Sequence, residues 1–162
     1  MATIDLKDVT MYIKDGGSNS VEMKIGEGTL TYTEARNMEY TLERGLLDTV
    51  REGDQVPMAV SFDLKWEFLV SSTSSSPTAE EALKQSGAAS DWTSTSADQC
   101  EPYAVDIEIH HDPACSTEEL EITTLPDFRW ESIDHDIQAG TLSVSGNCNA
   151  TTASIVRSAQ TT

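Results

Sequence analysis

Residues 56–70 read VPMAVSFDLKWEFLV, and an apolar residue stands at every second position of this stretch. A helix would spread such a set around its axis, whereas a strand gathers it on one face. Fifteen residues in a strand span about 50 Å, against about 17–20 Å for an ordinary strand. We therefore predict a long strand that crosses a whole sandwich or belongs to a large barrel. Its buried face would consist of Val56, Met58, Val60, Phe62, Leu64, Trp66, Phe68 and Val70.

Shorter stretches with the same alternation lie on both sides of this strand. Turn residues such as Asp15-Gly16-Gly17 and Ala139-Gly140 separate several of them. The pattern predicts about eight or nine strands in a single all-β domain, folded as a sandwich or an open barrel. The polar residues 149–162 are expected to form a C-terminal tail. The shorter strands are expected within 4–13, 21–25, 30–32, 40–42, 103–109, 119–122, 128–130 and 142–148.

Residues 71–98 break the alternation and are rich in Ser and Thr. A helix is predicted from Thr78 to Ser86, because Thr78 and Glu81 match a capping box and Gly87 follows as a stop. Two interpretations stay open, a flexible surface insertion and a loop that packs on a neighbouring subunit. The residues assigned to such an inter-subunit contact are Thr78, Glu81, Leu83 and Trp92.

Charge is the strongest compositional feature, with ten Lys and Arg against 28 Asp and Glu and a formal net charge of −18. Binding to DNA or to an anionic membrane needs clustered cations, so we do not expect either. No apolar run reaches the about 18 residues of a membrane helix, and the N-terminus shows no pattern of an export signal. Cys100, Cys115 and Cys148 are expected as free thiols, although a Cys100–Cys115 bridge stays open.

Two groups of residues invite a chemical interpretation. His110, His111, Asp112 and Cys115 offer four metal ligands within six positions. Adjacent histidines in a strand point to opposite faces, and the spacing matches no zinc pattern, so an ordinary polar turn is favoured. Residues 134–136 read Asp-His-Asp, but no nucleophile or pocket signal accompanies them. We expect neither an enzyme nor a bound metal or cofactor.

Acidic residues recur on the polar faces of several predicted strands. Such a face can be a solvated exterior that discourages edge pairing, or the lining of a pore along which DNA slides. The long strand and the predicted hairpin of 103–109 and 119–125 contribute the candidates for a pore lining. These are Asp63, Glu67, Asp106, Glu108, Glu119 and Glu121.

Three stretches resemble the tail tube proteins, or major tail proteins, of tailed bacteriophages. They are residues 44–54 leading into the strand at 57–67, residues 115–134 with Phe-Arg-Trp-Glu-Ser-Ile-Asp at their end, and residues 140–149. The resemblance implies a β-sandwich subunit that forms hexameric rings and gives four strands to a common inner barrel. It further implies that rings stack into a hollow tube, that long loops reach neighbouring subunits, and that an acidic lumen carries double-stranded DNA.

The same resemblance implies a place and partners. The protein would assemble in the host cytoplasm and reside in the virion tail, and it would serve DNA ejection. Its partners would be further copies of itself and other tail proteins, namely the tape measure, the terminator and the sheath. Two alternatives remain at this point: another tail component, such as a terminator or baseplate-type ring, and a carbohydrate- or surface-binding β-sandwich module.

Overall fold

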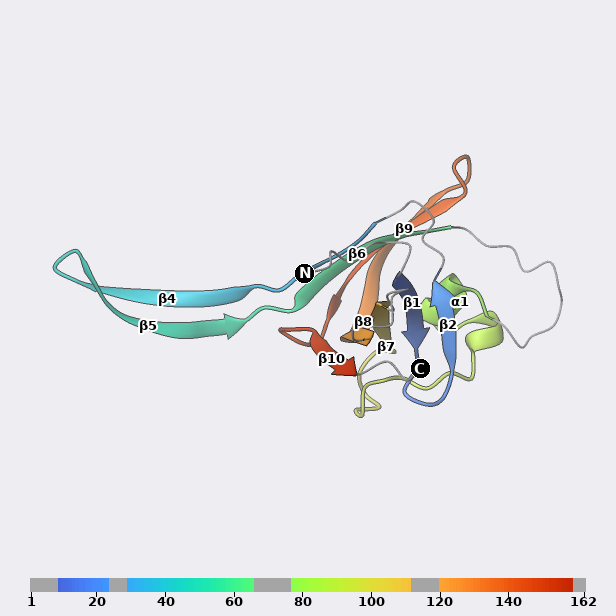
Figure 1. Ribbon diagram of the computed structural model, residues 1–162, viewed down its shortest axis with the longest axis horizontal. Coiled ribbons are helices and arrows are strands. Elements are labelled where there is room, and N and C mark those ends of the chain that lie inside the picture. Colours follow the sequence, from blue (N-terminus) through green and yellow to red (C-terminus); the bar gives the residue numbers. More distant parts are fainter. Residues whose placement is uncertain (1–8, 24–28, 66–76, 112–119, 159–162) are drawn as a thin grey trace.

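The computed structural model describes residues 9–23, 29–65, 77–111 and 120–158 (Figure 1). It is mostly β with one short α-helix, which confirms the all-β prediction. The described strands form an eight-stranded sheet and a separate two-stranded hairpin, and every described pairing is antiparallel.

The large sheet has the strand order β2-β1-β7-β8-β9-β6-β3, with β10 paired to β8. Its strands are β1 (Val9–Lys14), β2 (Ser20–Met23), β3 (Leu30–Thr33), β6 (Met58–Lys65), β7 (Val105–His111), β8 (Leu120–Asp136), β9 (Thr141–Cys148) and β10 (Ser154–Ser158). The separate hairpin consists of β4 (Arg36–Glu43) and β5 (Leu46–Gln55).

Strand β6 shows the alternation of buried and outward-facing residues that the sequence of the long stretch predicts. Met58, Val60, Phe62 and Leu64 are buried, while the residues between them face outward. The strand begins at Met58 and not at Val56, because Pro57 has no N–H to give to a ladder. Trp66–Val70 lie outside the described residues, so the predicted length is described only as far as Lys65.

The longest strand is β8, with 17 residues, where the sequence indicated two short strands. Its first half pairs with β7 and β10, and its second half pairs with β9. Phe128 stands where the two halves meet, opposite both Val105 and Cys148. A change of partners along one strand lets the sheet curl around a single core.

That core collects apolar side chains from strands at both ends of the sheet. Ile13 of β1, Ile107 of β7 and Phe62 of β6 belong to one cluster, and the rings of Phe62 and Phe128 lie 5.7 Å apart. Each fully buried side chain of this size contributes about 1.5–3 kcal/mol. The sheet and the insertion therefore form one packed body.

The insertion contains the predicted helix, as α1 (Ala79–Lys84), followed by a 3-10 turn at Gly87–Ala89. Thr78 caps the helix, with its Oγ1 accepting from the backbone N of Glu81 at 3.3 Å. The Glu81 carboxylate does not complete a capping box with Thr78, since it accepts from the backbone N of Ala88 at 2.9 Å.

Leu83 and Trp92, which the sequence assigned to an inter-subunit contact, are buried in the core of their own chain. The Tyr103 hydroxyl also donates to the backbone O of Ala82 at 3.0 Å, which fixes α1 against the body. In this conformation neither apolar side chain is available to a neighbour, because both are buried in the core cluster.

Asp15 joins the insertion to the turn between β1 and β2. Its buried carboxylate accepts from the backbone N of Gly17, Asn19 and Thr93, and from the Asn19 side chain, over 2.8–3.1 Å. Burial alone would raise the pKa of Asp15, but these four donors together lower it below its ordinary value. The ionised carboxylate is therefore part of the fold.

Candidate interaction surfaces

The β4–β5 hairpin is an arm that continues the β3–β6 hairpin beyond the body (Figure 1). Thr33 pairs with Ala59 in the body, and Arg36 pairs with Gln55 at the root of the arm. The ladder is interrupted between these pairs, at residues 34–35 and 56–57. We refer to residues 36–55 as the arm.

The arm ends in a two-residue turn formed by Arg44 and Gly45. Their φ angles are 54° and 82°, as a type I′ turn requires. Glycine adopts this conformation freely, but arginine pays about 1–2 kcal/mol for it. The turn thus holds a cationic side chain at the outermost point of the arm.

One face of the arm is apolar and uncovered. Tyr40 pairs with Val50 and Leu42 with Leu47, so the four side chains share a face, and they are 64%, 56%, 63% and 76% exposed respectively. The other face is mostly polar and carries the Glu39–Arg51 ion pair and the Thr41–Thr49 hydrogen bond, with Leu46 opposite Glu43 at its outer end. A two-stranded hairpin with an exposed apolar face is poorly stable in water by itself, so this face needs a partner.

A second surface lies on the solvent side of β3, β6, β9 and the second half of β8. We call it the hydroxyl–acid face, because small hydroxyl side chains and carboxylates cover it. Asp63 accepts from Ser143 Oγ at 2.8 Å, and Asp134 stands on the other side of Ser143 in the same cross-strand row. Its further members are Thr31, Ser61, Glu131, Ser132, Asp136, Thr141, Ser145 and Asn147, together with two cations, Lys65 opposite Thr141 and Arg129 opposite Asn147.

Asp134 and Asp136 were not among the pore-lining candidates, although both join Asp63 on this face. The alternation of residues 134–136 could have indicated that the two aspartates share one face of the strand. Asp134 and Asp136 point to the solvent side, whereas His135 points to the other side and contacts Glu80 of α1 at 2.9 Å. This alternation separates the histidine from the two aspartates.

Glu108 lies on the solvent side of β7, but cations compensate its charge. Lys14 Nζ and His110 Nε2 each lie 2.8 Å from its carboxylate, and the His110 ring packs edge-on against Tyr12. Burial raises the pKa of Glu108, yet the hydrogen bonds and charges of Lys14 and His110 lower it overall. Glu108 is thus one member of an ion-pair cluster.

Asp106 has a local structural contact. Its Oδ1 accepts from the backbone N of Asp127 at 3.0 Å, at the bulge where β8 changes register. Burial, and then the nearby carboxylates of Asp127 and Glu108, raise the pKa of Asp106 above its ordinary value. Asp106 therefore stabilises the bulge of β8 through this hydrogen bond, but its ionisation lowers the stability of the fold.

Glu121 and Glu108 lie on opposite sides of the sheet. Glu121 stands opposite His111, while Thr124 stands opposite Glu108. The alternation of the sequence places Leu120 and Ile122 in the core, but Thr123 and Leu125 are the buried residues. The bulge at Asp127, where φ is 51°, changes the phase and allows both Leu125 and Phe128 to face the core.

The six pore-lining candidates therefore do not form one surface among the described residues. Asp63 belongs to the hydroxyl–acid face, and Asp106 and Glu108 lie beyond it on β7. Glu121 lies on the other side and pairs with Arg157 of β10 at 2.9 Å. Glu67 and Glu119 lie outside the described residues.

The predicted ligand group is only partly described. His110 and His111 are successive residues of β7 and share no face, and Asp112 and Cys115 lie outside the described residues. Within the described ranges no three His, Cys, Asp or Glu side chains are arranged to hold a metal ion. Cys148 is buried, and burial followed by the charges of Asp106 and Asp127 raises its pKa to about 12, while Cys100 is exposed.

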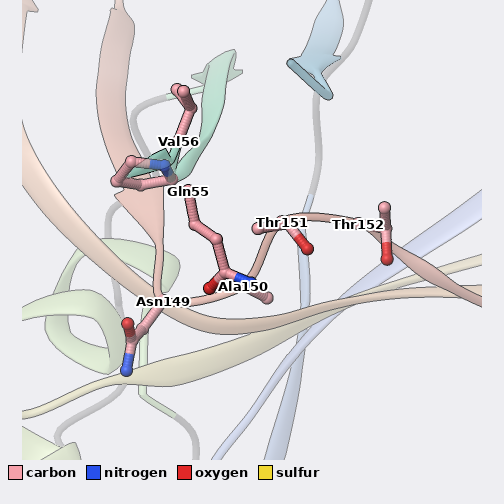
Figure 2. A pocket seen from close by; sticks show the side chains of 7 residues that line it. Gln55, Val56, Asn149, Ala150, Thr151 and Thr152 are labelled. Atoms are coloured by element: carbon pink, nitrogen blue, oxygen red, sulfur yellow. The ribbon is translucent and has the colours of Figure 1, made fainter. Parts of the chain in front are cut away.

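An open hollow of about 490 Å³ lies where the arm joins the body (Figure 2). Gln55, Val56 and Pro57 line one side, and residues 149–152 of the β9–β10 connection line the other. The backbone N of Met58 donates to the backbone O of Ala150 at 2.9 Å beside it. The lining includes no titratable side chain, so the hollow offers no group for acid–base chemistry.

A comparison of the sequence with known protein families finds no match, and a comparison with curated proteins finds none either. Among the helices of the described residues, none has the length and hydropathy that crossing a bilayer requires.

Proposed function

We propose that this chain is a structural subunit of a bacteriophage tail tube, in which rings of identical copies stack around a lumen that carries DNA. The observation that carries the proposal is the arm. Its apolar face, with Tyr40, Leu42, Leu47 and Val50, is more than half exposed at every one of these residues. A chain that builds such a face on a projecting hairpin is suited to association with further copies.

The hydroxyl–acid face supports the same proposal as the wall of the lumen. It covers four adjacent strands, which is the number that the resemblance to tail tube proteins assigns to each subunit. Its four carboxylates, Asp63, Glu131, Asp134 and Asp136, outnumber its two cations, Lys65 and Arg129, so the face as a whole repels phosphate groups. Its short hydroxyl side chains offer DNA no stacking surface. The charge of the whole chain agrees, since six copies at −18 each would bring −108 to a ring.

Negative-stain electron microscopy of the purified protein, together with its mass by light scattering, tests this function. The expected result is rings or hollow tubes with a central channel, and a mass that is a multiple of the 17.6 kDa chain. A chain that stays monomeric at high concentration and in both low and high salt, with and without the other tail proteins, would contradict the proposal.

A further inference from the structure

Strand β8 has two unequal neighbours along its first half. β7 pairs with one side of residues 121–124, and β10 pairs with the other. On β7, Val105 and Ile107 are 1% and 0% exposed, whereas Ile155 and Val156 of β10 are 54% and 57% exposed. The hydrophobic core therefore anchors β7, while β10 lies at an edge of the sheet where its side chains face water.

Few side-chain contacts hold β10 in place. Arg157 Nε lies 2.9 Å from the Glu121 carboxylate, but the Arg157 side chain is 65% exposed. An exposed ion pair of this kind contributes little to stability. None of residues 154–157 belongs to the core cluster, while Ala153 directly before the strand packs against it. The strand is thus held mainly by its backbone hydrogen bonds to β8, and the chain is anchored at Ala153.

The core side chains of β8 lie largely beyond its ladder with β10. The last pair of that ladder is Thr124–Ser154, and the buried Leu125 and Phe128 follow it. The connection that leads into β10 borders the open hollow at the root of the arm, through residues 149–152 (Figure 2). Release of β10 therefore uncovers backbone groups of β8 and little of the core.

We propose that β10 is a releasable strand. It opens from β8 as a unit while the body stays folded, and the uncovered edge accepts an extended segment of another polypeptide. Segments with few buried contacts open locally in this way, because little opposes their release. The uncovered edge is Leu120–Thr124, whose backbone groups then pair with the incoming strand. The inference concerns a single chain and goes beyond the proposed tube function without resting on it.

The register of β10 defines which segment fits this edge. Val156 stands opposite Ile122, and Arg157 stands opposite Glu121. An incoming antiparallel strand therefore needs a β-branched apolar residue followed by a cation, so that both cross-strand pairs form again. The net charge of −18 on the whole chain also favours a cationic segment.

Hydrogen exchange of the full chain tests the opening. β7 and β10 pair with the same residues of β8, so β7 is the internal control. We expect the β10 amides that bond to β8 to exchange at least about 100-fold faster than those of β7, because β7 is released only when the core opens. Equal protection of the two strands would overturn the inference, since β10 would then open only with the whole body.

A disulfide lock tests whether the opened edge accepts a strand. The variant carries Ile122→Cys and Val156→Cys, in a chain with Cys100→Ser and Cys115→Ser. Directly opposed residues lie about 4.5–5.5 Å apart at Cα, which is within the range of a disulfide. The probe is a fluorescent peptide with the sequence of residues 152–158, and its anisotropy reports binding. We expect binding to the parent and to the reduced variant, and at least about ten-fold weaker binding to the oxidised variant, in which β10 stays on β8.

The outcomes of the lock experiment are distinct. Equal binding to the oxidised and reduced forms would overturn the inference, because the peptide would then occupy another surface. Absence of binding to both the parent and the reduced form would overturn it as well, since the edge of β8 would not accept a strand. A peptide with Arg157→Glu should bind the parent several-fold more weakly, and an unchanged affinity would refute the selection of a cation by Glu121.

Discussion

Replacing the apolar face of the arm should abolish assembly and leave the isolated chain as stable as before. The four substitutions are Tyr40→Ser, Leu42→Ser, Val50→Ser and Leu47→Ser. These side chains are between 56% and 76% exposed, so about two-thirds of each remains to be buried by a partner. At about 1.5–3 kcal/mol for a whole side chain, the four together contribute about 4–8 kcal/mol to a contact that covers them. That is about 700-fold or more in the association constant, at about 1.4 kcal/mol per ten-fold.

The matched control substitutes the same number of residues on the opposite face of the arm. It carries Glu39→Ser, Thr41→Ser, Thr49→Ser and Arg51→Ser. Assembly is measured by sedimentation velocity across a dilution series, and the stability of the monomer by thermal unfolding. We expect the control to assemble within about ten-fold of the parent concentration, since exposed polar contacts contribute little.

The reasoning fails if the apolar-face variant assembles at the same concentration as the parent. Equal loss of assembly in both variants would also refute it, because the integrity of the hairpin and not its apolar face would then govern association. A fall in the thermal midpoint of the apolar-face variant would show that the arm packs on its own chain, contrary to the exposure of these side chains.

The remaining predictions concern titratable groups. Asp15→Ala should lower the free energy of unfolding by about 2–4 kcal/mol, because three backbone N–H groups lose their acceptor, and denaturant titration measures this. Since the folded-state pKa of Asp15 is lowered, its contribution is present above the unfolded-state value of 3.8 and is lost as the pH falls through the folded-state pKa. If the free energy of unfolding of Asp15→Ala falls at acid pH as steeply as that of the parent, this reasoning is contradicted. The effect of Asp106 on stability has the opposite sign. Its folded-state pKa is raised, so its ionisation lowers the free energy of unfolding as the pH rises. Asp106→Asn, which keeps an acceptor for the Asp127 N–H, should raise the thermal midpoint at pH 7, and a lower midpoint would refute the assignment. Asp63→Lys with Asp134→Lys should leave rings intact and slow DNA ejection from virions that carry the variant. Ejection at the normal rate would show that this face does not line the lumen.

Local signals were enough to predict part of the fold. The alternation of 58–64 indicates the buried face of β6, and the Thr78 cap with Gly87 indicates the helix, because each depends on residues close in sequence. The phase of β8 could not be predicted in this way. The Asp127 bulge that sets it is held by Asp106 and by Thr95 Oγ1, which lie 21 and 32 residues away.

The candidate surfaces show a second reason why the sequence was not sufficient. Alternation reports that a strand has one apolar face, but it does not report which chain covers that face. The pattern of Tyr40 and Leu42 is the same in kind as that of Val60 and Phe62, yet the first pair is exposed and the second is buried. The exposed and the buried pair are distinguished only by strand pairing: β4 pairs with β5 in a separate hairpin, whereas β6 belongs to the large sheet.

A single long hairpin joins the two surfaces on which the proposed function depends. Its inner part, β3 and β6, belongs to the hydroxyl–acid face, and its outer part, β4 and β5, carries the apolar face of the arm. Pro57 lies between them and cannot donate to the ladder, while the Met58 N–H turns to Ala150 of the body. The backbone hydrogen bonds of the large sheet and its connections therefore reach along this hairpin only as far as Met58. Because no ladder bond crosses this junction, substitutions in the arm should leave the hydroxyl–acid face unchanged, and assembly and DNA passage can be impaired one at a time.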